Sequence, residues 1–205
     1  MSVARSLDEL VAGLADPDGN QRTKALGELS LHGRAAVPAL TAALGHADVE
    51  VRAQAMIALA FIADPSSVET FAAHVADADG RIRGNAANGL AQLRDPRALD
   101  ALIHTLNDYP AFNQYPSTLS TAGLIELGPA ALPRLGPLLS SSDVMTRVRA
   151  SYVVQRIVTA MPGEDWPARW RALGSYDATS TDDVTRERAA EMWRAWIAAL
   201  PGAGA

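Results

Sequence analysis

The chain has 205 residues, of which 48% are hydrophobic and 20% are charged, and it contains no cysteine. This composition supports a packed core and excludes a disordered or fibrous chain, while the lack of cysteine excludes disulfides, thiolate metal sites and cysteine nucleophiles. The net charge of −5 disfavours nucleic acid and anionic membrane as partners unless the 18 basic residues gather on one face.

The first ten residues contain Asp8 and Glu9, where a secretory signal peptide would need an unbroken apolar run. No stretch of about 18 apolar residues, the length that a membrane-spanning helix requires, occurs in the sequence. We therefore expect a cytoplasmic protein that does not contact a membrane.

One short motif recurs along the chain: an Asp, or a substitute for it, lies four residues before an Arg or its substitute, at the head of an Ala- and Leu-rich stretch. The second members of successive pairs are 30, 31, 34, 30 and 39 residues apart. Recurrence at such a period is the signature of a protein built from stacked repeats. The pairs are Asp18/Arg22, Asp48/Arg52, Asp79/Arg83, Asn113/Ser117, Asp143/Arg147 and Asp182/Arg186.

Apolar residues follow the Arg position at the third, fourth and seventh places, as Ala25, Leu26 and Leu29 do in the first repeat. This spacing predicts an amphipathic helix, and the small alanines would let neighbouring helices approach closely. A second apolar helix is expected in each repeat, at about residues 7–14, 35–44, 66–75, 96–106, 129–139 and 164–173. Each repeat is therefore a helix pair, and we expect a single domain, 1–205, with repeats at about 6–33, 34–63, 64–94, 95–128, 129–161 and 162–200.

Residues that favour helix ends agree with this division. The Asp of each pair is expected to cap its helix, Asp64-Pro65 and Asp95-Pro96 place a capping carboxylate before a proline, and Gly33 and Gly128 mark helix ends. An Arg in the first turn is disfavoured by the helix dipole, so its recurrence calls for an anionic partner. We predict that each Arg reaches the capping Asp of its own or the neighbouring repeat, and that these pairs form a ladder along the stack.

Two units, Asp48-Val-Glu-Val-Arg-Ala-Gln-Ala-Met-Ile-Ala-Leu and Asp79-Gly-Arg-Ile-Arg-Gly-Asn-Ala-Ala-Asn-Gly-Leu, together with Ala36-Val-Pro-Ala-Leu between repeats, resemble HEAT repeats of the phycobilin-lyase-like subclass. The resemblance covers nearly the whole chain and implies an all-α, right-handed α-solenoid of about six helix pairs. That family contains scaffolds, adaptors, chromophore lyases, a hydroxylase and DNA glycosylases, so the fold does not fix the function.

The resemblance further implies that the helices headed by the Asp/Arg pairs line a concave groove, with the second, fifth, sixth and ninth residues after each Arg facing it. The middle of this groove is rich in amides, and Asn85, Asn88 and Gln92 share one helical face. Amides donate and accept hydrogen bonds, which suits the backbone of an extended peptide, although a merely solvated polar face would show the same residues. The candidate partner-binding residues are Gln54, Asn85, Asn88, Gln92, Glu126, Arg149, Tyr152 and Arg156, beside Lys24 and Glu28 in the first repeat.

Repeat four departs most from the pattern, with Asn113 and Ser117 in place of the charged pair. Two X-Pro steps and three aromatic residues before its helix make a stiff, adhesive loop, and loops on a rigid scaffold are where binding residues concentrate. Tyr109, Phe112 and Tyr115 are therefore a second candidate partner site. The alternative is that their rings fill a gap left by the irregular repeat.

All four tryptophans lie near the C-terminus, in the pairs Trp166/Trp170 and Trp193/Trp196, each spaced to share one helical face. A solenoid must cover its last apolar face, so the rings are expected to form the core of a C-terminal cap; an aromatic cage is the alternative. The polar stretch 174–183 is expected to be a surface loop.

The sequence assigns no catalytic residue, no metal site and no cofactor. The iron-binding His-Glu dipeptides of the related hydroxylase are absent, because none of the four histidines is followed by Glu. Nucleophile motifs and Gly-rich phosphate loops are absent as well. An alkylated-base DNA glycosylase would draw on arginines, aromatics and acids in the second half of the chain, namely Asp108, Tyr109, Tyr115, Arg149, Tyr152, Arg156 and Arg188.

We therefore predict a non-enzymatic scaffold or adaptor that binds a protein or peptide segment in the groove, at the repeat-four loop, or at both. A nucleic-acid-binding protein centred on Arg149, Arg156 and Arg188, with or without base excision, is the alternative. A chromophore-lyase-like protein is a further alternative, implied by the family resemblance alone.

Overall fold

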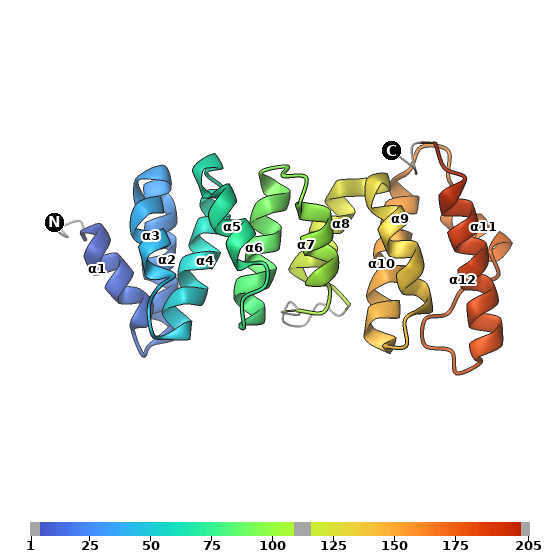
Figure 1. Cartoon of the computed structure of the whole chain (residues 1–205), viewed down its shortest axis with the longest axis horizontal. Coiled ribbons are helices and arrows are strands. Elements are labelled where there is room, and N and C mark those ends of the chain that lie inside the picture. The colour runs from blue at the N-terminus through green and yellow to red at the C-terminus, as the bar shows by residue number, and fades with distance from the viewer. Residues whose placement is uncertain (1–4, 109–115, 202–205) are drawn as a thin grey trace. The chain divides into compact units, whose positions relative to one another are not determined.

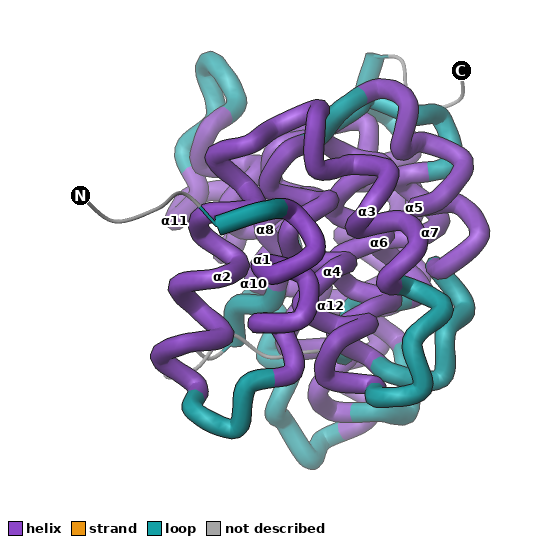
Figure 2. Tube along the Cα trace, turned by 90° about the vertical axis from the view of Figure 1, so that its left-hand side faces the viewer, coloured by secondary structure: helices purple, strands orange, loops and turns teal. Residues whose placement is uncertain are grey.

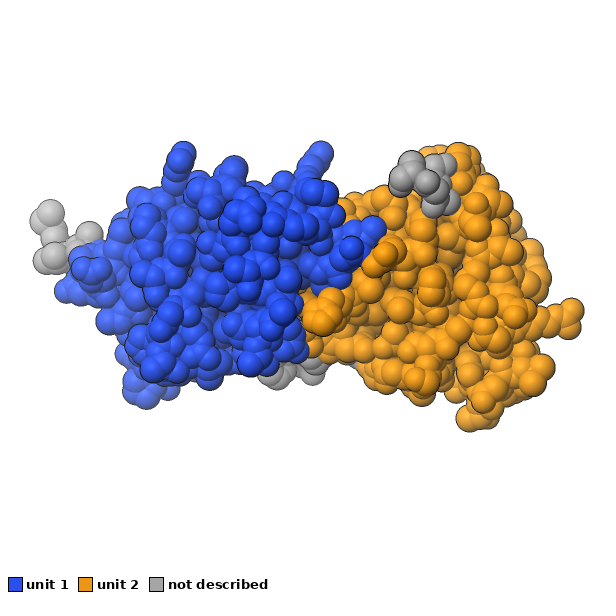
Figure 3. Space-filling view, viewed as in Figure 1, with its two compact units in different colours: residues 1–101 blue, residues 102–205 orange. Residues whose placement is uncertain are grey.

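The structure is a computed structural model that describes residues 5–108 and 116–201. Every regular element in this part of the chain is a helix (Figure 2). The chain divides into two compact units, residues 1–101 and 102–205 (Figure 3). None of the helices in the described ranges is both long and apolar enough to cross a membrane.

Unit 1 contains the predicted alternation of first and second helices. The first helices are α1 (Leu7–Ala12), α3 (Val37–Ala43) and α5 (Val68–His74), and the second helices are α2 (Gly19–His32), α4 (Val49–Ile62) and α6 (Gly80–Gln92). Short 3-10 turns precede or follow the first helices: η1 (Gly13–Ala15), η2 (Gly33–Ala36) and η3 (Pro65–Ser67). The helix α7 (Ala98–His104) crosses the boundary between the units.

Unit 2 contains the remaining helices. They are α8 (Leu119–Leu127), α9 (Leu132–Leu135), α10 (Val144–Ala160), α11 (Trp166–Ala172) and α12 (Asp183–Ala198), with the 3-10 turns η4 (Gly128–Ala131) and η5 (Gly136–Ser140) on either side of α9. The expected continuous helix over residues 129–139 is thus broken into three short pieces. Pro133 and Pro137 explain the break, because each lacks the N–H that an uninterrupted helix would need.

The second helices of unit 1 form one layer and the first helices another. Helix α4 packs between α2 and α6, while α3 packs on α4 and α5 packs on α6 (Figure 1). The third residue after each repeat Arg is a fully buried alanine in these helices: Ala25, Ala55 and Ala86. A single methyl group at this position lets the helix axes come close, as the sequence predicted.

The capping pattern is confirmed. The side chains of Asp18, Asp48 and Asp79 each accept a hydrogen bond from the backbone N–H two residues later, over 2.9, 2.9 and 2.8 Å. At the other ends of α2 and α8, Gly33 and Gly128 have φ of +54° and +64°, a backbone conformation that side chains with a Cβ adopt at a cost.

The repeat arginines do not bind the capping carboxylates, so this part of the prediction is wrong. Each one instead donates from Nη1 to the backbone carbonyl six residues earlier, in the loop that leads into its own helix. In α4, Arg52 Nη1 lies 2.8 Å from the carbonyl oxygen of His46 and 2.9 Å from that of Ala47. The same contact to the sixth residue back, 2.6–2.7 Å long, is made by Arg22 to Asp16, Arg83 to Asp77, Arg147 to Ser141 and Arg186 to Ser180.

Repeat four lacks this arginine, and its second helix starts later than the register predicts. Residues 116–118 are not helical, and α8 begins at Leu119 with Thr118 as its N-cap. Thr118 and Thr121 form a reciprocal capping box at the start of this helix. Asn113, which stands in the sequence where the other repeats have the capping Asp, lies outside the described residues. Ser117 has no guanidinium with which to hold the preceding loop.

The sixth helix pair is assembled in the reverse order. Helices α4, α6 and α10 each pack on the preceding second helix of their own unit, but α12 packs on α9 and η5, and α11 packs on α10 (Figure 1). The segment 174–182 between them is therefore more than the expected surface loop. Tyr176 and Ala178 are buried, Tyr176 Oη donates to the carbonyl of Leu139 over 2.6 Å, and Arg147 Nε donates to the carbonyl of Ala178 over 3.0 Å.

Two helical glycines give opposite expectations for the same substitution. A Cβ on Gly89 in α6 would lie 2.7 Å from three ring carbons of the fully buried Phe71, whereas a Cβ on Gly27 in α2 would meet nothing within 4 Å. Alanine adds about 1 kcal/mol of helix propensity at either site, but overpacking costs about 1–3 kcal/mol. We expect Gly27→Ala to raise the free energy of unfolding and Gly89→Ala to lower it, in urea titrations followed by circular dichroism. Stabilisation by both substitutions would contradict the close packing of α5 on α6.

The arginine-to-carbonyl contact can be tested at Arg52. Methionine keeps much of the apolar stem but cannot donate to the carbonyls of His46 and Ala47, so Arg52→Met should lower the free energy of unfolding by about 1–2 kcal/mol. Arg34 is the matched control, because its highly exposed guanidinium lies 3.7 Å from the Asp64 carboxylate. Arg34→Met should change the stability by less than about 0.5 kcal/mol. Equal effects of the two substitutions would show that the carbonyl contact adds nothing.

Candidate binding surfaces

Helical periodicity places equivalent residues of α2, α4 and α6 in rows across one outward face of unit 1, which we call the second-helix face. Two residues before each repeat Arg stand Asn20, Glu50 and Arg81; nine residues after it stand Leu31, Phe61 and Gln92. The two rows are about 16 Å apart, since 11 residues separate them along each helix. Between them lie the rows of Lys24, Gln54 and Asn85, and of Gly27, Ile57 and Asn88.

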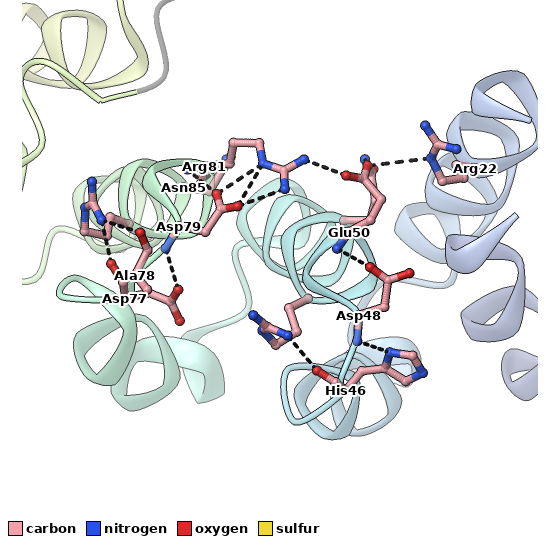
Figure 4. Close-up of polar contacts among 12 residues, drawn as sticks. Arg22, His46, Asp48, Glu50, Asp77, Ala78, Asp79, Arg81 and Asn85 are labelled. Carbon is pink, nitrogen blue, oxygen red and sulfur yellow. Dashed lines mark hydrogen bonds and ion pairs between the residues drawn. The ribbon is translucent and has the colours of Figure 1, made fainter. Parts of the chain in front are cut away.

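The first row carries a network of charges that we call the Glu50 ladder. Arg81 Nη1 lies 2.6 Å from one carboxylate oxygen of Glu50, and Arg22 Nε lies 3.6 Å from the other (Figure 4). Arg81 also binds the Asp79 carboxylate through Nη2 at 2.9 Å. Gln54 Nε2 donates to Glu50 over 2.8 Å. The ladder thus ties α2, α4 and α6 together, and Glu50 and Arg81 stand between the repeat residue Arg22 and the capping residue Asp79.

These contacts shift the titration of the carboxylates. The hydrogen bond from Arg81, followed by that from Gln54, holds the pKa of Glu50 below its ordinary value. The hydrogen bond from Arg81 likewise lowers the pKa of Asp79. Because these charges already face one another, the ladder is suited to bracing the helices rather than to recruiting a charged partner.

The structure separates the predicted amides of the groove. Asn85 is buried, at 6% exposure, and its Nδ2 donates to the carbonyl of Arg81 over 2.8 Å, so the expectation that it faces a partner in the groove is wrong. Asn88 is half-buried and Gln92 is exposed. Gln54 is half-buried and engaged with Glu50. Only part of the amide surface is therefore presented to solvent.

Sequence reasoning missed two apolar residues on this face. Leu31 is 88% exposed and Phe61 is 71% exposed, at equivalent positions of the adjacent helices α2 and α4. Both lie nine residues after a repeat Arg, a position that was expected to face the groove. Reading that position in every repeat would have found them, because a large apolar side chain there breaks the otherwise polar pattern.

The predicted groove residues of unit 2 are also divided. Glu126 and Arg156 are exposed and Tyr152 is half-buried, but Arg149 is buried, and its Nη1 donates to Asn107 Oδ1 over 2.7 Å. Arg149 therefore does not face a partner as expected. Arg156 and Arg188, both exposed, belong to α10 and α12, which lie in different layers. Tyr109, Phe112 and Tyr115 lie outside the described residues.

Three of the four tryptophans, for which the sequence predicted a cap core or an aromatic cage, line a cavity in unit 2 that we call the tryptophan pocket. Its volume is about 330 Å³, and it lies where η5, α10, α11, α12 and the segment 174–182 meet. Trp193 is buried and stacks on Trp166 with ring centroids 5.4 Å apart, whereas Trp170 is 36% exposed at the edge. The lining residues are Leu139, Ser151, Val154, Gln155, Trp166, Trp170, Tyr176 and Trp193.

Hydrogen bonds and ring contacts hold the walls of the pocket. Trp170 Nε1 donates to the carbonyl of Tyr176 over 3.1 Å, and Tyr176 is itself anchored to the carbonyl of Leu139. Burial raises the pKa of Tyr176 to about 12, so the phenol is neutral at physiological pH. Outside the pocket, the rings of Trp193 and Trp196 are nearly perpendicular with centroids 5.5 Å apart, and the Arg169 guanidinium lies 4.9 Å from the centroid of the Trp196 ring.

A family model for HEAT repeats matches the sequence twice, at residues 7–83 and 37–113, and so covers more than half of the chain. The chain belongs to the HEAT-repeat family. The family prediction is therefore confirmed, and with it the all-α solenoid class of fold. The two overlapping matches coincide with the part of this HEAT-repeat chain where the Asp/Arg pairs are most regular.

Among solved structures, this HEAT-repeat chain is similar to two engineered proteins and to the complex of CpcE and CpcF of phycocyanin lyase from Nostoc sp. PCC7120. The first engineered protein is 18% identical, with 95% of this chain and 97% of that chain covered and a TM-score of 0.48. The second is 18% identical, with 95% and 99% covered and a TM-score of 0.44. The phycocyanin lyase structure is 22% identical, with 91% and 96% covered and a TM-score of 0.42. No curated protein matches the sequence.

The lowered pKa of Glu50 makes the ladder sensitive to acid. A carboxylate whose folded-state pKa is depressed stabilises the fold above its unfolded value of 4.5, and this contribution is lost as the pH falls below that value. Glu50→Gln should therefore lose less stability than the wild type between pH 7 and about pH 3, in urea unfolding at the two pH values. Glu191→Gln, which alters an exposed carboxylate of α12, is the control. An unchanged pH dependence in Glu50→Gln would show that the ladder does not stabilise the fold.

Proposed function

We propose that this protein is a non-enzymatic scaffold that binds a segment of a partner protein on the second-helix face of unit 1. The observation that carries the proposal is the exposure of Leu31 and Phe61 on neighbouring helices of that face. Solenoids present extended faces of this kind to their partners. Large apolar side chains that stand together in water are a mark of interaction surfaces.

The two anchors supply part of the energy that recognition needs, and the other contacts of the face supply the rest. Burying a leucine or phenylalanine side chain contributes about 1.5–3 kcal/mol, so Leu31 and Phe61 together offer roughly 3–6 kcal/mol before the cost of ordering the partner. Adjacent packed helices are about 8–10 Å apart, and a chain in the polyproline II conformation advances about 3.1 Å per residue with three residues per turn, so its side chains at i and i+3 share one face. The partner segment should therefore carry two apolar side chains roughly three residues apart.

The charged and amide side chains of the second-helix face determine which other groups the partner segment should carry. Glu50 is engaged with Arg22 and Arg81, and Glu28 is paired with Arg5 at 2.7 Å. The side chains of Asn88 and Gln92 carry donors and acceptors that suit the partner's backbone. Binding should therefore depend on apolar anchors and amides, and it should survive about 150 mM salt, which suppresses binding through phosphates alone.

The alternative of nucleic-acid binding, centred on Arg149, Arg156 and Arg188, has less support in unit 2 than protein binding has in unit 1. It required Arg149, Arg156 and Arg188 to form one exposed positive strip, but Arg149 is buried and bonded to Asn107. Chromophore-lyase activity stays a prediction from the family resemblance.

The proposal is tested by separating apolar anchoring from fold stability. A double variant, Leu31→Gln/Phe61→Gln, keeps good helix formers and removes both anchors. The partner protein is first identified by affinity capture with the wild type at about 150 mM salt. In calorimetry, this partner should bind the purified variant at least tenfold more weakly than the wild type. The melting temperature of the variant should equal that of the wild type. An Asn88→Ala/Gln92→Ala variant should weaken binding by a smaller factor.

The matched control is Val184→Gln in α12, which alters an apolar side chain that is 81% exposed elsewhere on the chain. This variant should bind the partner as the wild type does. Equal affinity of the wild type and the Leu31→Gln/Phe61→Gln variant, or an equal loss in the Val184 control, would overturn the assignment of the site.

A further inference from the structure

The tryptophan pocket has the size of a ligand site. Small-molecule pockets in proteins begin at about 300 Å³, and an apolar cavity of about 150 Å³ is known to take up one benzene ring. The pocket of unit 2, at about 330 Å³, therefore has room for roughly two fused rings. It is open to solvent on the side of Gln155 and Trp170, which are exposed, so a ligand need not unfold the unit to enter.

The lining of the pocket selects an uncharged ligand. None of the lining residues carries a charge at neutral pH. The polar groups of the lining residues are largely engaged. The Ser151 hydroxyl donates to the carbonyl of Val148 over 2.9 Å, and the Tyr176 hydroxyl and the Trp170 indole N–H donate to backbone carbonyls. A charged ligand would lose its hydration here without gaining a counterion. The exposed amide of Gln155 can pair with one polar substituent at the mouth.

The pocket is also pre-organised. Trp166 and Trp193 are stacked, and Trp170 and Tyr176 are fixed by their hydrogen bonds. Walls that already hold their bound conformation pay little ordering entropy when a ligand enters.

We propose that the tryptophan pocket is a binding site for one uncharged, flat aromatic group of about two fused rings, with its polar edge toward Gln155. The site is independent of the second-helix face of unit 1. The same group could arrive as a free small molecule or as a tryptophan side chain of a partner protein, and the test separates these two sources.

The test uses the full chain and matched probes. 2-Naphthol, which is uncharged at pH 7, should bind with a stoichiometry of one in calorimetry. 2-Naphthoate, its anionic counterpart, should bind at least tenfold more weakly. N-acetyltryptophanamide probes the second source: binding comparable to that of 2-naphthol assigns the pocket to a side chain, and at least tenfold weaker binding assigns it to a free molecule. Both results support the site.

Variants place the binding in the pocket. Ser151→Phe projects a ring into the space from α10 and should weaken 2-naphthol binding at least tenfold, while Thr159→Phe, on the exposed surface of the same helix, should leave it unchanged. If Ser151→Phe fails to fold by circular dichroism, Gln155→Trp at the exposed mouth replaces it. The proposal is overturned if 2-naphthol shows no saturable binding, if 2-naphthoate binds as tightly, or if the blocking variant binds as the wild type does.

Discussion

Each repeat arginine holds the loop that leads into its own helix, and the regularity of the stack depends on this contact. The guanidinium reaches back six residues to a carbonyl oxygen that would otherwise face solvent or lie unpaired, as Arg52 does to His46. The capping Asp at the same end accepts from one of the free helix N–H groups, as Asp48 does from Glu50, so the turn has a partner for a donor as well as for an acceptor. With the turn fixed, successive second helices start at equivalent points, and the side chains on their outward faces fall into rows.

Those rows explain how one face carries both ion pairs that link the helices and apolar side chains that are exposed to solvent. Near the helix starts, the Glu50 ladder neutralises its own charges across three helices. Near the helix ends, the same register puts the exposed side chains of Leu31 and Phe61 at equivalent positions of the adjacent helices α2 and α4. In repeat four, Ser117 stands in the place of the arginine, and α8 begins late, at Leu119.

Much of this arrangement was predictable from local sequence. Helix pairs, Asp caps and the buried alanine row follow from periodicity and from side-chain chemistry within a few residues. The partner of each repeat arginine was not predictable, because it is a backbone carbonyl. Every residue has a carbonyl, so the sequence does not indicate which carbonyl accepts the hydrogen bond. Asn85 was misplaced for a similar reason: its side chain bonds the carbonyl of Arg81 in its own helix, which removes it from the face that its position suggested. The tryptophan pocket depends on the exchange of α11 and α12, a matter of tertiary packing that no repeat pattern encodes.

That exchange decides which helix each layer carries at the sixth pair. In an ordinary repeat the first and second helices stand in the order that a neighbouring repeat matches. At the sixth pair the second-helix layer carries the seven-residue α11, and the sixteen-residue α12 occupies the other layer. A repeat in ordinary order, stacked on this pair, would find its long helix opposite a short one.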